Sequence, residues 1–183
     1  MSSSLVPLIT IGGHCHKINL YLSSLSPLQP SHPERSLGIS RECEKKMQKI
    51  NNLSIYTDGG ARGNPGPAAI GVDASPVFQL SEYIGKTTNN VAEYTALIKA
   101  LQYLRENKIS AHKISFFLDS QLIVKQIKGE YKIKQPHLIT LNIKAHILID
   151  QLKPSQLYFS YIPRNQNKIA DALVNQALDR PAA

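Results

Sequence analysis

The sequence predicts an α/β fold in which a five-stranded mixed sheet is flanked by helices. Three strand-like segments follow one another between residues 53 and 84, which indicates an antiparallel meander. Segments with helical periodicity then alternate with two later strand-like segments, an order typical of a sheet covered by helices. The 183 residues are 42% hydrophobic, which is enough for one compact domain with a core.

The first three strands are predicted at Leu53–Asp58, Ala68–Asp73 and Val77–Ile84. The stretch at residues 56–71, YTDGGARGNPGPAAIG, links the first two. Its glycine spacing fits neither common phosphate-binding motif, and its two prolines lack the N–H groups that such a loop needs. We therefore expect a strand, a tight turn and a second strand, with Asp58 at the end of the first strand.

The first long helix is predicted at Asn89–Asn107. Its residues Tyr94, Leu97, Leu101 and Leu104 recur at helical spacing and form a stripe that faces the core. The same patterns predict a strand at Lys113–Asp119, helices at Ser120–Lys128 and Pro136–Leu152, a strand at Leu157–Ile162 and a last helix at Asn165–Leu178.

Residues 1–46 differ in composition from the rest of the chain. They are rich in Ser, Pro and Leu and show no lasting amphipathic period, which predicts a disordered or weakly structured N-terminal extension. A targeting segment for an organelle is a weakly supported alternative, because Arg is nearly absent. A natural start at Met47 is another alternative.

The net charge of +8 favours a polyanionic partner, most simply nucleic acid, although many small proteins are basic without one. Cys15 and Cys43 form no CxxC pair and suggest no disulfide framework. A reducing compartment, and so a cytoplasmic location, is expected. The segment Gly13–His16 lacks a partner pair at metal-ligand spacing. No segment is apolar enough to span a membrane, so no membrane partner is expected.

Four carboxylates occur where solvated charges are unusual: Asp58, Glu93, Asp119 and Asp171. Each has an ordinary structural explanation by itself. Aspartates start turns, a glutamate suits the positive end of a helix, and Asp119 could cap the helix that follows it. The four together make up a large share of the few acidic residues beyond Asn51, which favours a shared function.

Five motifs, four of which contain one of these carboxylates, occur in one order. They are Tyr56-Thr57-Asp58-Gly59-Gly60, Gly63-Asn64-Pro65-Gly66, Thr88-Asn89-Asn90-x-x-Glu93, Asp119-Ser120-Gln121 and Asn167-x-x-Ala170-Asp171. Together they resemble type 1 ribonuclease H, a member of the ribonuclease H-like superfamily. The resemblance covers roughly Asn51 to Asp179, so residues 51–180 are expected to form the catalytic domain. The family's fold has the element order predicted above.

The resemblance implies a metal-dependent endonuclease that cuts the RNA strand of RNA–DNA hybrids, leaving 5′-phosphate and 3′-hydroxyl ends. Two Mg²⁺ ions, with Mn²⁺ as an alternative, would activate water and stabilise the leaving oxygen, and such hard cations prefer carboxylate ligands. By the resemblance, Asp58 bridges both ions and Asp171 shares the ion that activates water. Glu93 and Asp119 hold the ion that faces the leaving group.

The resemblance also assigns contacts with nucleic acid. It places Asn64, Asn89, Asn90 and Gln121 against the RNA strand, and their amides suit a 2′-hydroxyl and minor-groove edges. Thr88 and Asn90 match positions that hold a phosphate of the DNA strand. Helix capping is the alternative explanation for Asn89 and Asn90. The lysines near Gly129 either grip the DNA backbone or form a solvated face: Lys125, Lys128, Lys132 and Lys134.

The chain departs from the family in the loop before the last aspartate. Many members have a histidine there, but residues 161–167 contain none, and His137 and His146 lie in a separate predicted helix. Arg164 is the nearest candidate for contact with the scissile phosphate, with a surface role as the alternative.

Other functions stay open from the sequence. The chain could also act on double-stranded RNA, belong to ribonuclease H-like resolvases or transposases, or bind hybrids without cutting them. The full set of four carboxylates argues against a pure binder, because a binder would gain phosphate affinity by losing them. No heptad or exposed apolar stripe suggests a protein partner, so a monomer is expected.

Overall fold

The computed structural model describes residues 9–11, 14–16 and 50–180. The chain divides into two compact units, Met1–Cys43 and Glu44–Ala183. In the first unit, β1 (Ile9–Ile11) pairs antiparallel with β2 (His14–His16). The remainder of the predicted extension, residues 1–46, lies outside the described residues, so its disorder and the domain boundary stay predictions.

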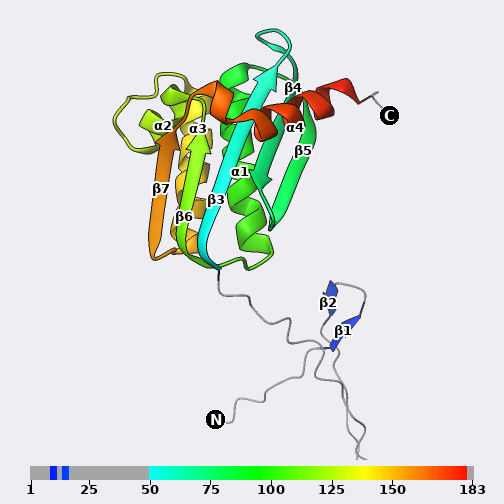
Figure 1. The fold of residues 1–183 in the computed structure, drawn as a ribbon, viewed down its shortest axis with the longest axis vertical. Coiled ribbons are helices and arrows are strands. Elements are labelled where there is room, and N and C mark those ends of the chain that lie inside the picture. Colours follow the sequence, from blue (N-terminus) through cyan, green and yellow to red (C-terminus); the bar gives the residue numbers. More distant parts are fainter. Residues whose placement is uncertain (1–8, 12–13, 17–49, 181–183) are drawn as a thin grey trace, which may run out of the picture. The chain divides into compact units, whose positions relative to one another are not determined.

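The second unit contains a five-stranded mixed sheet in the order β5-β4-β3-β6-β7 (Figure 1). Strands β3, β4 and β5 form an antiparallel meander, while β6 and β7 run parallel to β3. This arrangement confirms the predicted fold class. The strands are β3 (Ile50–Ala61), β4 (Gly66–Ala74), β5 (Phe78–Thr87), β6 (Ala111–Leu118) and β7 (Gln156–Tyr161).

The helices follow the predicted order, with one change at the last of them. They are α1 (Asn89–Glu106), α2 (Gln121–Ile127), α3 (Pro136–Leu152) and α4 (Lys168–Asp179). The last helix begins three residues later than predicted, because η2 (Arg164–Gln166) is a 3₁₀ turn. There the N–H groups of Gln166 and Asn167 bond to carbonyls three residues back, at 2.8 and 2.9 Å.

Helices α1 and α4 cover opposite faces of the sheet. A Cβ on Gly59 would meet the backbone of α1, whereas one on its neighbour Gly60 would meet Val174 of α4. Successive side chains of a strand point to opposite faces, which places the two helices on different sides. Figure 1 shows α4 crossing the near face and α1 with α3 behind the sheet. The main core lies on the α1 side, where all four residues of the predicted apolar stripe are fully buried.

The prediction that Asp58 ends the first strand is wrong. Strand β3 continues to Ala61, and Asp58 pairs with Gly71 in the middle of the ladder with β4. The turn comes only at residues 62–65, closed by a 2.8 Å hydrogen bond from the Arg62 N–H to the Pro67 carbonyl. Gly59 is therefore a strand residue whose missing side chain admits a helix, and not a turn residue.

The monomer was predicted because no exposed apolar stripe was found in the sequence, and this reason is wrong. Helix α3 carries an exposed apolar stripe at i, i+4 and i+8, formed by Ile139, Ile143 and Ile147. The monomeric state stays a prediction. Among the described residues, no helix is both long and apolar enough to cross a membrane.

Candidate active site

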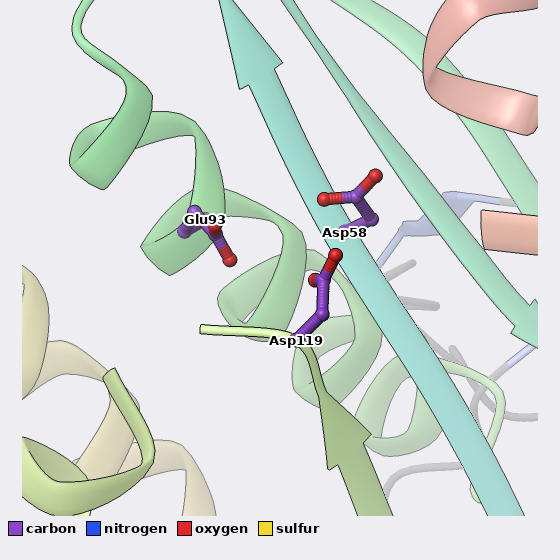
Figure 2. Close-up of side chains that lie close together, drawn as sticks. All are labelled: Asp58, Glu93 and Asp119. Carbon is purple, nitrogen blue, oxygen red and sulfur yellow. The ribbon is translucent and has the colours of Figure 1, made fainter. Parts of the chain in front are cut away.

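Three carboxylates from three separate elements meet at one edge of the sheet (Figure 2). Asp58 comes from β3, Glu93 is the fifth residue of α1, and Asp119 directly follows β6. One ligand oxygen of each lies within 4.8 Å of the others. Asp58 and Glu93 are only 6% and 8% exposed, so their charges have little access to bulk water.

The topology explains how residues from opposite sides of the sheet meet. The pairing of β3 with β6 ends at Thr57 and Leu118, one residue before Asp58 and Asp119. Beyond this point β3 has no neighbour on that side, so Glu93 can reach Asp58 past the edge of the sheet. The close approach of α1 requires Gly59, because a Cβ there would lie 2.1 Å from the Ala92 carbonyl carbon.

Asp171 on α4 lines the same cleft of about 310 Å³ as the other three carboxylates. Its Oδ1 accepts hydrogen bonds from Arg164 Nη2 at 2.5 Å and Nε at 3.2 Å. The Nδ2 of Asn175, one turn along α4, donates to Oδ2 at 3.2 Å. The fourth predicted carboxylate is thus near the other three, but it is paired with a cation of the chain itself.

Burial and the neighbouring negative charges raise the pKa values of Asp58 and Glu93. Burial, with the charges of Asp119 and Asp171, raises the pKa of Asp58 from 3.8 to about 7. Burial, with the charges of Asp58 and Asp119, raises the pKa of Glu93 well above its ordinary value. The buried Oε2 of Glu93 has no hydrogen-bond partner. Clustered hard oxygens, strained by repulsion and not fully hydrogen-bonded, fit a divalent cation such as Mg²⁺.

The residues predicted to contact the RNA strand gather mostly at the start of α1. Asn64 Oδ1 accepts from the Asn89 N–H, and Asn89 Oδ1 accepts from the Ala61 N–H, both at 3.3 Å. The side chain of Asn64 thus supports the start of α1. The Asn89 side chain bonds to the Ala61 N–H and does not cap the helix, which was the alternative explanation for this residue. Thr88 precedes the helix without a side-chain capping bond, and Asn90 is half-buried beside it.

The other predicted contacts come from α2 and from the turn before α4. Gln121 is exposed at the first position of α2, two residues after Asp119. Arg164 and Asn89 line the cleft directly. His137 and His146 are exposed on α3 and are not among the residues that line the cleft.

Two asparagines at the site received no role from the sequence. Asn175 lies four residues after Asp171, a spacing that puts both on one side of α4. Asn167 is 1% exposed and contacts Asp119. Its place in the motif Asn167-x-x-Ala170-Asp171 was the only signal for it.

Comparison with known proteins identifies the family. A family model described as reverse transcriptase-like matches residues 58–177, which include all four carboxylates. Ribonuclease HI of Halobacterium salinarum is 39% identical over 132 residues, covering 69% of this chain and 64% of that protein. The chain belongs to the type 1 ribonuclease H family.

Two further members of the ribonuclease H family show how far the similarity extends. The bifunctional protein Rv2228c of Mycobacterium tuberculosis is 40% identical over 134 residues, which is 70% of this chain but 36% of that protein. LC11-RNase H1, isolated from compost by a metagenomic approach, was crystallised with an RNA/DNA hybrid. That structure is 48% identical, covers 69% of this chain and 96% of its own, and has a TM-score of 0.63. This chain spans 36% to 64% of the length of the two curated relatives.

The buried carboxylates predict an unusual pH dependence of the stability of this ribonuclease H family member in the absence of metal. Asp58 has a pKa of 3.8 in the unfolded chain and about 7 in the folded one, so the folded state holds the proton between these values. The stabilisation from this group is full below about pH 4 and is lost as the pH rises through 7, a change of at most about 4 kcal/mol in the free energy of unfolding. Urea unfolding in EDTA across this pH range measures the effect.

Two controls define that result. Excess Mg²⁺ should flatten the profile, because a cation stabilises the ionised carboxylates. Asp58→Asn should make the profile less steep without metal, because Glu93 is then the carboxylate of the cluster whose pKa is still raised. A free energy of unfolding that rises from about pH 5 to 8 in EDTA, equally in the native chain and the variant, would contradict the assigned pKa shift.

Proposed function

We propose that this chain is a metal-dependent endonuclease that hydrolyses the RNA strand of RNA–DNA hybrids and leaves 5′-phosphate and 3′-hydroxyl ends. The observation that carries the proposal is the meeting of three carboxylate oxygens within 4.8 Å, in a cleft that Asp171 also lines. Family membership and the hybrid bound to LC11-RNase H1 support the substrate class.

The proposed cofactor is a pair of Mg²⁺ ions, for which Mn²⁺ can substitute. Asp58 clusters with Glu93 and Asp119, and the charge of Asp171 also raises its pKa, so it is the residue suited to share both ions. Glu93 and Asp119 would complete one set of ligands and Asp171 the other. When bound, such a pair activates the attacking water and stabilises the leaving oxygen.

Arg164 has a defined task in this proposal. It holds Asp171 through two N–H groups while 78% of its side chain stays exposed. A fixed guanidinium with free donors facing the cleft suits a phosphate oxygen. We assign to it the phosphate contact in the loop where many family members have a histidine.

The asparagines at the start of α1 provide the selection for RNA. The Ala61 N–H donates to the Oδ1 of Asn89, and Asn64 Oδ1 accepts the Asn89 backbone N–H, so the Asn89 side chain is held at the cleft beside the carboxylates. Amides fixed in this way can bond to a ribose 2′-hydroxyl, which DNA lacks. Asn90 and Gln121 extend the proposed contact with the RNA strand, and Thr88 with Asn90 would bind a phosphate of the DNA strand.

The test is cleavage of an end-labelled RNA–DNA hybrid with Mg²⁺ or Mn²⁺, beside duplex DNA, double-stranded RNA and an EDTA control. Cleavage of only the RNA strand of the hybrid, with 3′-hydroxyl ends and full inhibition by EDTA, is the expected result. Binding of the hybrid without cleavage by either metal would overturn the proposal in favour of a binding protein. Equal cleavage of double-stranded RNA would widen the substrate class.

A further inference from the structure

The buried side chain of Asn167 has a role that the proposed chemistry does not yet include. It is 1% exposed and stands at the position just before α4. An asparagine at such a position usually caps the helix with its side-chain oxygen, but Asn167 makes no capping bond. Its Oδ1 has no hydrogen-bond partner at all. Burying an amide whose oxygen has no hydrogen-bond partner is unfavourable. The bonds made by the Nδ2 group must therefore explain why an asparagine lies at this buried position.

The Nδ2 group of Asn167 joins β3 to Asp119, the residue that directly follows β6. It donates to the Thr57 carbonyl at 3.0 Å and to Asp119 Oδ1 at 3.1 Å. Thr57 directly precedes Asp58, and it forms the last pair of β3 with β6. The amide therefore lies where the ladder between these strands ends, and it ties the first residue beyond β6 to β3.

The backbone of Asn167 contacts the segment that carries Asp171. Its carbonyl accepts the Asp171 N–H at 3.0 Å in the first turn of α4. Asn167 therefore contacts Asp119 directly, the residue before Asp58, and the amide of Asp171. Through these three hydrogen bonds, Asn167 connects the segments that carry Asp58, Asp119 and Asp171.

We propose that Asn167 is a positioning residue that sets the orientation of the Asp119 carboxylate for divalent-cation binding. This inference rests on the proposed function, because the cation is the one proposed above. A carboxylate offers about four lone-pair sites, so Asp119 can accept the Nδ2–H bond and still present oxygen to a cation beside Asp58 and Glu93. Outer hydrogen bonds of this kind fix ligand carboxylates, and their removal typically weakens metal binding about 10–100-fold.

The test compares Asn167→Leu with the native chain by calorimetric titration of Mg²⁺ and Mn²⁺ in the absence of nucleic acid. Leucine has a similar shape, removes the donor and adds no charge that could bind metal itself. Asn165→Leu in the same loop is the control, because Asn165 is exposed. The expected result is a cation affinity about tenfold or more weaker in Asn167→Leu and unchanged in the control.

Kinetics on the hybrid supply a second readout. The variant should need more Mg²⁺ for half-maximal rate and lose kcat, while its KM for hybrid at saturating Mg²⁺ stays that of the native chain. A folded Asn167→Leu with native cation affinity would overturn the inference. A native chain that binds Mg²⁺ but leaves hybrid uncut would overturn the proposed function alone.

A measurement on the native chain covers the case in which the variant does not fold. The side-chain amide signals of Asn167 in proton–nitrogen correlation spectra should shift during a Mg²⁺ titration, with the same midpoint as the calorimetric binding. Signals of Asn165 should stay in place. An Asn167 amide that does not respond to bound Mg²⁺ would overturn the positioning role.

Discussion

Replacement of Asp58 by asparagine is expected to slow hybrid cleavage about 10³-fold while making the metal-free protein more stable. The asparagine would keep the shape but lose the charge that both proposed cations share, so several kcal/mol of transition-state stabilisation are lost, which corresponds to about a 10³-fold lower rate. The folded state also loses a carboxylate whose ionisation burial opposes. Single-turnover cleavage and urea unfolding at about pH 8 in EDTA, measured on the same preparation, report both effects.

Asp73→Asn is the matched control for that variant, because Asp73 is also a buried carboxylate of the same sheet. Its carboxylate accepts bonds from Ser75 N at 3.2 Å, Ser75 Oγ at 2.6 Å and Gln79 Nε2 at 2.9 Å. Burial opposes its ionisation, but these bonds lower the pKa of Asp73 overall. Asp73→Asn should lower the free energy of unfolding by about 1–3 kcal/mol and keep the cleavage rate. An Asp58→Asn variant that cuts at the native rate would refute the assigned role of Asp58.

Replacement of Gly59 by alanine is expected to lower the stability of the fold strongly. A Cβ at this position would lie 2.1 Å from the Ala92 carbonyl carbon and 2.3 Å from the Glu93 nitrogen. These are backbone atoms of α1 that cannot turn aside, so β3 and α1 must separate. We expect a loss of about 3 kcal/mol or more, a fall in Tm of roughly 10 °C, and weaker cation binding because Glu93 moves from Asp58.

Gly60→Ala is the control for Gly59→Ala, because it adds the same methyl group to the neighbouring residue of β3. Its Cβ would meet only the Cγ1 atom of Val174, at 3.0 Å, and a side-chain methyl can shift more easily than a helix backbone. Thermal unfolding and Mg²⁺ titration of the two variants should therefore separate clearly. If Gly59→Ala were as stable as Gly60→Ala, the close packing of α1 against β3 would not be what Gly59 provides.

Much of the fold follows from local patterns that need no knowledge of distant contacts. The stripe of Tyr94 and Leu97 with its helical spacing predicted α1, and its burial confirms the assignment. Alternation predicted the meander of β3, β4 and β5. The end of β3 was mispredicted because Gly59 and Gly60 are usual in turns, and only the helix packed on them shows why a strand needs them.

The sequence alone identified the four carboxylates of the candidate site. Its carboxylates and amides occur in an order that already indicates a metal-dependent nuclease of this family. Their distances were decided only by the tertiary structure. Asp58 and Asp119 are far apart in the sequence, and they meet because parallel pairing of β3 with β6 ends beside both. The pairing of Asp171 with Arg164 and the bridge from Asn167 to Asp119 also depend on where a 3₁₀ turn sets the start of α4. Local periodicity carries no information about such contacts, because they arise from the packing of whole elements against one another.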